Sequence, residues 1–364
     1  MNNTQLSHIN QNCGPILITG HTGFKGTWLT MLLEHYGVEV VGLSLPADPN
    51  SLFSRTKRLG KIKEEFFDIR DERKVKNFIE RVSPRVIIHL AAQSLVLESY
   101  KNPKLTFDVN VGGLVNLLNA FGRSDSTEVI LISTTDKVYE NTGSGIAFIE
   151  NDSLRGKDPY SASKVAAENA VIAWREILKE DSNKKILIAR AGNVIGGGDL
   201  SENRLIPDII RAFDSGSDLV IRNPFSTRPW QHVLDPLKGY LKMIDNSLKN
   251  SSIDTLNFGP IGKSLSVLEV VDIATKFWPS KSKITYVRSK EYSESLLLEL
   301  NSSLAFYELD WKPVWSQEEA VIESIAWWKD VLGRKTSAFE RCELDILKCL
   351  NNYKTEHYNL ENGI

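Results

Sequence analysis

Cysteine is scarce in this sequence, with only three among 364 residues. Cys13, Cys342 and Cys349 form no CxxC pair and are not interleaved with histidines. This spacing argues against a structural zinc site and against a disulfide scaffold, and it fits a reducing compartment best. We therefore expect no bound metal.

The sequence also lacks an excess of charge of either sign and lacks long apolar runs. Its 44 lysines and arginines nearly balance 46 aspartates and glutamates, which gives a formal net charge of −2. Nothing in this balance indicates a nucleic acid or an acidic membrane surface as a partner. The polar amino terminus lacks the features of a signal peptide, and no apolar run approaches the length that spans a bilayer. We expect a soluble, cytoplasmic protein.

Short apolar runs alternate with amphipathic helical stretches through the first half of the sequence. The runs that predict buried strands are 16–19, 38–43, 86–90, 129–133 and 186–189, with a further strand near Phe66 and Phe67. Between the first two runs, apolar residues recur at the three- and four-residue spacing of a helix with one buried face. This alternation predicts an α/β fold with a Rossmann-like, doubly wound parallel sheet.

The stretch TGHTGFKG connects the first predicted strand to the first predicted helix. In this position Gly20 permits a tight turn, Gly23 lets the backbone approach a pyrophosphate, and Gly26 lets the helix pack closely on the strand. Free amides at the start of the helix would face the anion. A purely structural turn is the alternative, but the flanking strand and helix favour a dinucleotide site.

The glycine loop alone does not distinguish NAD from NADP. The second predicted strand ends at Ser44 without the acid that usually meets a free ribose hydroxyl, and Asp48 is a displaced candidate. No arginine directly follows the strand to hold a 2′-phosphate, because Arg55 is farther along, and this favours NAD. Asp68, in FFDIRD, could contact the adenine or could be a solvated loop acid.

After Gly192 the alternation loosens into segments that contain glycine and proline. We expect residues 1–190 to form an NAD-binding Rossmann domain that carries the catalytic cluster. Residues 191–364 are expected to form a smaller, mixed α/β region that mainly binds the substrate, with possible return segments to the first domain. In this region Ser266 and Glu269 predict a capping box that opens a helix over 267–278.

Tyr160 and Lys164 stand one helical turn apart in DPYSASKVAAEN and therefore project from the same face. An ammonium near a phenol lowers the pKa of the phenol, so Tyr160 could act as a base toward a substrate hydroxyl. A YxxxK pair alone is a common accident of helices. Here it follows a glycine loop and a strand that ends in Thr134 and Thr135, in the order that short-chain dehydrogenases use. Thr135 would hydrogen bond the hydroxyl that Tyr160 deprotonates.

Asp136 and Lys137 follow directly in ISTTDKVYE. A simple dehydrogenase or 4-epimerase has no evident use for them, whereas a dehydratase does. Once C4 of a sugar is a ketone, Lys137 could remove the acidic C5 proton while Asp136 protonates the departing C6 hydroxyl. An ordinary lysine is protonated at neutral pH, so burial or a cation such as Lys164 would have to lower its pKa. The alternative is that Lys137 merely pairs with Asp136 or with a phosphate.

With these motifs the sequence resembles the extended short-chain dehydrogenase/reductase family over almost its whole length, and within it the CDP-glucose 4,6-dehydratases. The stretches that carry the resemblance are GHTGFKGTWL, HLAAQSLV, TTDKVYEN, DPYSASK, GNVIGGGD, NRLIPD and RPWQHVLDPLKGYL. TTDK is the most specific, because related sugar-nucleotide dehydratases usually carry an acid and a glutamate there. The resemblance implies a lyase of surface polysaccharide biosynthesis that makes CDP-4-keto-6-deoxyglucose. It also implies tightly held NAD and a homodimer or higher homo-oligomer.

The resemblance further implies which residues bind the two ligands. The cofactor set is Gly20, Thr22, Gly23, Phe24, Lys25, Gly26, Ser44, Asp68, Ile69, Leu90, Ala91 and Ala92, together with Tyr160 and Lys164. The sugar-nucleotide set is Gln93, Asn193, Arg204, Leu205, Ile206, Arg228 and His232. Arg228 offers a planar fork for a diphosphate and Asn193 a neutral donor. Alternatively, Asn193 closes a turn and Arg228 stacks on Trp230.

Some positions depart from the family pattern. After HLAAQ the family usually reads close to PLVRRSY, where this sequence has Ser94, Leu97 and Glu98 in place of the proline and the basic pair. The other departures are Leu200 in place of a tryptophan, Asn301 in place of an aspartate and Leu304 in place of a lysine. These changes spare the catalytic cluster but could reshape recognition of the sugar or nucleotide. The alternatives are therefore an epimerase or dehydratase of another CDP- or CMP-linked sugar, or a non-catalytic NAD-binding paralogue.

Overall fold

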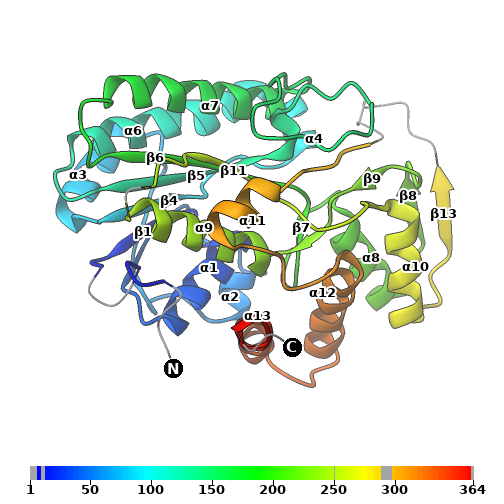
Figure 1. Cartoon of the computed structure of the whole chain (residues 1–364). Coiled ribbons are helices and arrows are strands. Elements are labelled where there is room, and N and C mark those ends of the chain that lie inside the picture. Colours follow the sequence, from blue (N-terminus) through cyan, green and yellow to red (C-terminus); the bar gives the residue numbers. More distant parts are fainter. Residues whose placement is uncertain (1–5, 10–12, 250, 288–296, 362–364) are drawn as a thin grey trace.

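The computed structural model describes residues 6–9, 13–249, 251–287 and 297–361. Its centre is a seven-stranded sheet in which every neighbouring pair of strands is parallel (Figure 1). In spatial order the strands are β11 (Thr255–Phe258), β6 (Lys185–Ala191), β5 (Val129–Thr135), β4 (Val86–His89), β1 (Ile16–Thr19), β2 (Val40–Ser44) and β3 (Lys63–Phe66). The doubly wound parallel sheet predicted from the sequence is confirmed.

Two layers of helices enclose this sheet (Figure 1). One face carries α3 (Glu72–Val82), α6 (Leu114–Arg123) and α7 (Pro159–Ile177), and the other carries α1 (Phe24–His35) and α9 (Leu234–Ser247). Successive side chains of β5 enter opposite cores, with Leu131 on the α1 and α9 side and Ile132 on the α7 side. A parallel sheet covered on both faces needs strands that are apolar on both sides, which explains the continuous apolar runs.

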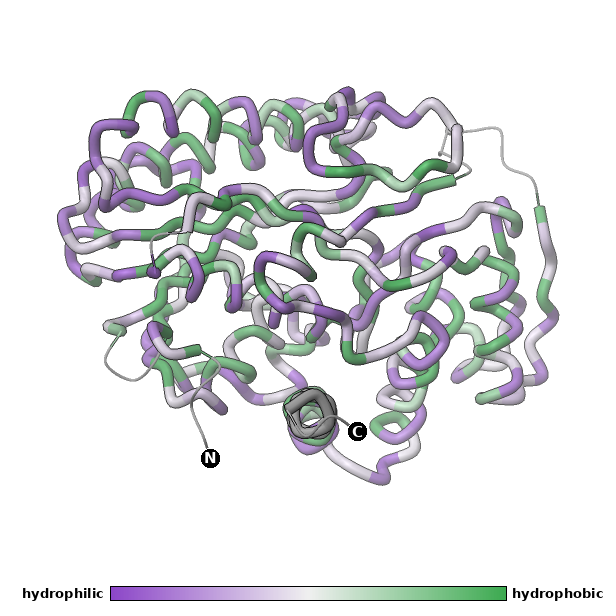
Figure 2. Tube along the Cα trace, in the orientation of Figure 1, coloured by the Kyte–Doolittle hydropathy of each residue, from purple (hydrophilic) through white to green (hydrophobic). Residues whose placement is uncertain are grey.

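Helices α3 and α6 are amphipathic, in keeping with the mixture of hydrophobic and hydrophilic residues along the helices in Figure 2. Helix α1 differs from the prediction of one buried face, because residues 26–33 are all buried. The first half also contains five shorter helical segments. These are α2 (Leu52–Arg55), α4 (Val96–Lys101), α5 (Pro103–Phe107), a π-helix (Asp108–Gly113) and a 3₁₀ turn (Asp136–Val138).

The strands predicted from the first half are all present, and their bounds differ from the prediction by a few residues. Strands β5 and β6 each continue two residues farther than predicted, to Thr135 and Ala191. Strand β11 was not predicted at all. It comes from the second half of the chain, pairs with β6 and extends the sheet by one strand.

The remainder of the second half forms three small two-stranded sheets and the helices around them. The strand pairs are β7 (Val194–Ile195) with β10 (Gln231–His232), β9 (Thr227–Arg228) with β12 (Leu265–Ser266), and β8 (Leu219–Arg222) with β13 (Ile284–Val287). The helices are α8 (Leu205–Ser215), α10 (Val267–Phe277), α11 (Ser303–Leu309), α12 (Gln317–Leu332) and α13 (Ala338–Glu361). The capping box of Ser266 and Glu269 at the start of α10 is confirmed.

The three cysteines are buried and form no disulfide bonds with one another. In the described part of the chain, no histidines, cysteines and acids gather into a set that could hold a metal ion. A membrane-crossing span would need a long, apolar helix, and the described residues contain none.

The packing of α9 against β11 can be tested at Gly239. A Cβ atom there would lie 2.3 Å from the ring of Phe258 and 3.0 Å from the indole nitrogen of Trp311. Overpacking of this kind lowers the free energy of unfolding by about 1–3 kcal/mol, so we expect Gly239→Ala to be less stable than wild type in urea. The control is Gly112→Ala, where a Cβ would meet nothing within 4 Å. Equal stability of the two variants would contradict the packing described.

Candidate active site

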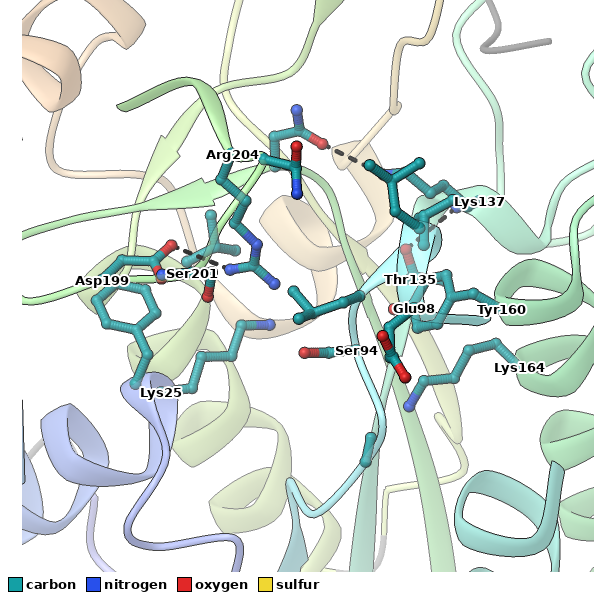
Figure 3. A pocket seen from close by; sticks show the side chains of 18 of the residues that line it. Lys25, Ser94, Glu98, Thr135, Lys137, Tyr160, Lys164, Asp199, Ser201 and Arg204 are labelled. Carbon is teal, nitrogen blue, oxygen red and sulfur yellow. Dashed lines mark hydrogen bonds and ion pairs between the residues drawn. The ribbon is translucent and has the colours of Figure 1, made fainter. Parts of the chain in front are cut away.

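A cavity of about 890 Å³ opens where β1, β4, β5 and β6 end. The glycine loop, the end of β5 and the start of α7 line one side of it. The other side of the cavity is lined by side chains from residues 191–208 and 220–230. The cavity therefore lies between the sheet and the second half of the chain, at the carboxyl edge where open α/β sheets place their ligands. Figure 3 shows side chains from both sides pointing into it.

The glycine loop is shaped by two close backbone approaches. Gly20 has a φ of +77°, and a Cβ there would lie 2.7 Å from the backbone nitrogen of Ala91. A Cβ on Gly26 would lie 2.2 Å from the carbonyl oxygen of Gly20. Helix α1 then begins at Phe24, and its N-cap residue, Gly23, provides no side-chain cap. The first amides of α1 are thus left for an anion in the cavity, which fits a pyrophosphate.

Side chains beyond β2 and β3 form the far end of the cavity. The Ser44 and Thr22 hydroxyls lie 2.7 Å apart. Asp68 accepts hydrogen bonds from the Arg70 guanidinium, which hold the pKa of its carboxyl below the ordinary value. Asp48 and Arg55 are not among the residues that line the cavity. The Asp48 carboxylate accepts the amide of Asn50, and the Arg55 guanidinium lies 5.6 Å from the ring centre of Trp328.

The end of β5 brings the predicted catalytic groups together. The Thr135 hydroxyl donates to Oδ1 of Asp136 at 3.0 Å, and it lies near enough to the Tyr160 hydroxyl to influence the pKa of that phenol. The Lys137 ammonium lies 3.5 Å from the same Asp136 oxygen and 3.3 Å from Oδ1 of Asn193. Strand β5 delivers Thr135, the 3₁₀ turn delivers Asp136 and Lys137, and α7 delivers Tyr160. All of these side chains line the one cavity.

Asp136 is fully buried, and its two carboxylate oxygens differ. Oδ1 accepts from Thr135 and Lys137, whereas Oδ2 has no hydrogen-bond partner among the described residues. A Cβ on Gly192 would lie 3.3 Å from Oδ2, so glycine at that position keeps the space beside the oxygen open. A buried carboxyl with one unoccupied oxygen is suited to exchange a proton with a bound ligand.

The pKa of Tyr160 differs from the sequence-based expectation. Burial raises it to about 12, although the hydrogen bond with Thr135 and the charge of Arg204 act in the opposite direction. Lys164 was expected to lower this pKa, but its ammonium donates to the carbonyl oxygen of Ser133 at 3.2 Å. Burial also lowers the pKa of Lys164 itself to about 8. The loss of solvation outweighs the help that a neighbouring cation gives to the phenolate.

Lys25 supplies a second buried cation at the same end of the cavity. Its ammonium donates to the Tyr240 hydroxyl at 3.3 Å, and that hydroxyl lies 3.1 Å from Oγ of Ser133. Burial, together with the charge of Arg204, lowers the pKa of Lys25 to about 8. Figure 3 shows Lys25 and Arg204 approaching the cavity from opposite chain halves.

The predicted sugar-nucleotide residues divide into two groups. Asn193, Arg204, Leu205, Ile206 and Arg228 line the cavity. The Arg204 guanidinium pairs with Asp199 at 3.0 Å, and the Arg228 guanidinium donates to the carbonyl oxygen of Thr227 at 2.7 Å.

Gln93 and His232 do not line the cavity. The amide of Gln93 donates to Thr106 and to the Leu95 carbonyl, so it shapes the loop after β4. His232 is fully buried, with its ring 6.0 Å from Trp28 and 4.2 Å from Trp315, and burial lowers its pKa to about 3. We therefore leave both residues out of the proposed substrate contacts.

The cavity also contains residues that the sequence did not single out. Arg155 and Lys157, which precede α7, and Arg222, at the end of β8, add positive charge to its wall. No local motif marks these three residues, because only the tertiary fold brings the segment before α7 and the end of β8 to the cavity. Among the departures from the family pattern, Ser94, Leu97 and Glu98 line the cavity, whereas Leu200, Asn301 and Leu304 do not.

Residues 17–324 match the family described as GDP-mannose 4,6 dehydratase. The chain belongs to this family. It is 36% identical to the CDP-glucose 4,6-dehydratase of Salmonella typhimurium, over 86% of this chain and 90% of that protein. It is 26% identical to the UDP-glucose 4-epimerase of Mycoplasma genitalium, over 78% of this chain and 87% of that protein.

Solved structures of this dehydratase and epimerase group share the fold. The dTDP-glucose 4,6-dehydratase of Bacillus anthracis, solved in complex with NAD, matches with a TM-score of 0.74 and 22% identity, over 87% of this chain and 97% of that one. The Thermus thermophilus UDP-glucose 4-epimerase complex with NAD matches with a TM-score of 0.75 and 21% identity, over 86% and 99%.

The burial of Lys164 predicts a change of stability with pH. Its folded pKa of about 8 lies below the ordinary value of 10.5, so between these values the unfolded chain binds more protons. The free energy of unfolding therefore gains a contribution that rises with pH above 8, by up to about 1.4 kcal/mol per pH unit. We expect Lys164→Met to lose this contribution. In urea unfolding between pH 8 and 9.5, its free energy of unfolding should therefore rise less with pH, or fall more, than that of wild type.

Comparison with wild type isolates Lys164, because the buried cysteines and tyrosines that also titrate at alkaline pH are common to both proteins. The matched control is Lys63→Met, since the Lys63 side chain is 79% exposed. Identical pH slopes for wild type and Lys164→Met would show that Lys164 is solvated in the folded protein.

Proposed function

We propose that this protein is an NAD-dependent sugar-nucleotide 4,6-dehydratase that converts CDP-glucose to CDP-4-keto-6-deoxyglucose. The observation that carries the proposal is the placement of Asp136 and Lys137 beside Thr135 and Tyr160 in one cavity. An oxidoreductase needs only a hydroxyl-handling pair, whereas a dehydratase needs a further acid and base. The 36% identity to a CDP-glucose 4,6-dehydratase over most of both chains supports the same substrate.

The glycine cradle and the uncapped start of α1 fit the pyrophosphate of NAD, with Ser44 and Asp68 at the adenosine end. When bound there, NAD would supply the hydride acceptor for sugar C4 and the hydride donor for C6. Tyr160, Lys164 and Lys25 lie at the opposite end of the cradle. We propose that these three side chains line the part of the cavity in which the nicotinamide ring and the sugar meet.

Oxidation of C4 uses the hydroxyls of Thr135 and Tyr160, which both line the cavity. Thr135 and Tyr160 together hold the C4 hydroxyl, and Tyr160 accepts its proton as the hydride leaves C4. Burial makes the phenolate costly, so a neighbouring cation is needed. Arg204 supplies such a charge, which acts against the rise that burial causes in the pKa of Tyr160.

Elimination of water follows from the acidity of C5 next to the new ketone. For this step the proton shared by the Asp136 and Lys137 pair must lie on Asp136, which leaves Lys137 as a neutral amine. Lys137 then removes the C5 proton, and the Asp136 carboxyl protonates the C6 hydroxyl, which leaves as water. The C5–H and C6–O bonds break, and a C5–C6 double bond forms. Return of the hydride to C6 and of a proton to C5 completes the 4-keto-6-deoxy sugar. The sum is the loss of one water without net oxidation.

The positive side chains on the second-half wall fit the substrate diphosphate. Arg204 and Arg228 are planar donors, and Asn193 holds the Lys137 ammonium while facing the cavity. We propose that residues 1–190 hold NAD and the catalytic groups, and that most of residues 191–364 bind the sugar nucleotide. We also propose a cytoplasmic enzyme, where the free cysteines remain reduced.

Turnover with CDP-glucose and with a panel of other sugar nucleotides tests the activity. We expect CDP-glucose to give a product with the near-ultraviolet absorbance of a 4-keto sugar, and no net accumulation of NADH. Steady release of NADH would identify an ordinary dehydrogenase. A 4-epimeric product would identify an epimerase, and no product from any sugar nucleotide would contradict the proposed function.

We propose a homodimer that pairs through α5 and α7, which contact each other. Leu105 and Phe107 of α5 are 38% exposed, and Ile172 of α7 is 55% exposed, so this helical face presents apolar side chains to solvent. We expect Ile172→Asp to shift the dimer to a monomer in analytical ultracentrifugation. The control is Ile261→Asp, because Ile261 is 69% exposed away from these helices. A wild-type monomer would contradict this assembly.

A further inference from the structure

The turn that carries Asp136 and Lys137 is held at both ends by one buried polar network. Thr134 precedes the turn, and its hydroxyl donates to Oε1 of Glu168 at 2.6 Å. Tyr139 follows the turn, and its hydroxyl accepts from the Arg190 guanidinium at 2.8 Å. Arg190 and Glu168 are themselves paired, so a closed path runs from one end of the turn to the other.

We propose that Arg190 is a positioning residue that, through Glu168, Thr134 and Tyr139, fixes the turn bearing Asp136 and Lys137 and thereby serves the elimination step. The inference rests on the proposed dehydratase function. It assigns a role to groups that the glycine loop, the YxxxK pair and the TTDK stretch do not include.

The geometry of the Arg190 and Glu168 pair is strongly constrained. Nη2 of Arg190 lies 2.6 Å from Oε2 of Glu168, and Nε lies 3.1 Å from both carboxylate oxygens. Arg190 is 5% exposed and Glu168 is 1% exposed. Burial opposes the charge on Arg190, but the hydrogen bond and charge of Glu168 outweigh it and raise the pKa of the guanidinium. Such a pair permits one arrangement, because any other would leave a buried charge unsatisfied.

Tyr139 is held by contacts to its ring and by hydrogen bonds to its hydroxyl. The Arg190 guanidinium carbon lies 4.9 Å from the centre of its ring, and the ring of Phe148 stacks on it at 4.8 Å and 3°. Its hydroxyl donates to Oδ1 of Asn257 at 2.7 Å, and Nδ2 of Asn257 donates to the Phe148 carbonyl. The exit of the turn is thus attached to β11 as well as to β6.

Stability alone does not account for this network. A buried ion pair often contributes little net stability compared with apolar residues of similar volume, because both charges lose their hydration. Five polar groups linked around a three-residue turn instead specify one position for it. The turn has no ladder of its own, since it lies beyond the last pairing of β5 with β6, Thr135 with Ala191.

The groups that oxidise C4 are held by other contacts. Thr135 remains within the β5 and β6 ladder, the backbone amide of Tyr160 donates to Ser99, and the Lys164 ammonium donates to the Ser133 carbonyl. Loosening the network should therefore displace Asp136 and Lys137 more than Thr135, Tyr160 or Lys164. Elimination should slow while C4 oxidation continues.

Two conservative variants test the proposal, Tyr139→Phe and Thr134→Val, because each deletes one hydroxyl and keeps the side-chain shape. Arg175→Met is the matched control. The Arg175 guanidinium also links α7 to β6, but it donates to the Ile186 carbonyl, at the opposite end of the strand. We expect Tyr139→Phe and Thr134→Val to lower kcat by roughly 10- to 100-fold, the effect of a small displacement of reacting groups, and Arg175→Met to leave it near wild type.

The decisive readout is the absorbance of enzyme-bound NADH near 340 nm during a single turnover of CDP-glucose. Both network variants should accumulate bound NADH, as Asp136→Asn should, and should show a larger isotope effect with C5-deuterated substrate. Lower turnover without accumulated NADH and without a larger isotope effect would mean that the network is only structural. Unchanged turnover in both variants would also overturn the proposal.

Hydrogen exchange of the ligand-free protein separates this proposal from the proposed function. Amides of residues 132–140 should exchange faster in Tyr139→Phe and Thr134→Val than in wild type, with no such change in Arg175→Met. If wild type converted no sugar nucleotide, the proposed dehydratase function would be rejected. If exchange in residues 132–140 were unchanged in both network variants, the positioning role of the network would be rejected, whatever the activity of the enzyme.

Discussion

The position at which β5 ends is the constraint on which the rest of the site depends. The ladder between β5 and β6 continues to Thr135, and the chain turns at once into a 3₁₀ helix whose first residue is the fully buried Asp136. A carboxylate can occupy such a position only if its neighbours supply donors, and Thr135 and Lys137 do so. The end of β5, the Asp136 carboxylate and its two hydrogen-bond partners therefore form one structural unit.

Burial is the main force that sets the chemistry of this unit. It raises the pKa of Tyr160 and lowers those of Lys164 and Lys25, so each group is shifted toward its neutral form before any ligand is considered. A sugar diphosphate and a dinucleotide bring charges that favour the ionised forms of these lysines. The empty cavity and the filled cavity thus favour different protonation states, and binding energy is coupled to proton uptake.

The sequence predicted the parts of the fold that depend on local patterns. Continuous apolar runs identified β1, β2, β4, β5 and β6 because these strands are buried on both faces, whereas the edge strand β3 is largely exposed. The glycine spacing identified the loop before α1. Strand β11 escaped because TLNF is short and contains Asn257, whose polar side chain is explained only by its bonds to Tyr139 and Phe148. The roles of Arg190 and Glu168 could not be predicted either, because their hydrogen-bond partners lie far away in the sequence.

For the candidate site too, the sequence predicted the residues of local motifs better than those whose direction depends on tertiary packing. Motif residues on a single loop or helix, such as Gly26 and Tyr160, reach the cavity, whereas His232 lies in a motif-rich stretch but faces two tryptophans. A two-residue strand can direct its side chains to the core or to a ligand, and only tertiary packing decides which. The direction of the pKa of Tyr160 was also beyond the sequence, because it depends on how completely the phenol is enclosed.

The order of strands in the sheet has a consequence for biosynthesis. Residues 185–191 form β6, but their outer neighbour is β11, which the ribosome releases more than sixty residues later. Until then the nascent polypeptide carries an open β-edge next to the turn that will become the reaction centre, and such edges are prone to pair with other chains. Helix α9, which is synthesised just before β11, packs on the same sheet and brings the capping strand to its place. The sheet that carries the glycine loop is thus completed only by a strand from the second half of the chain.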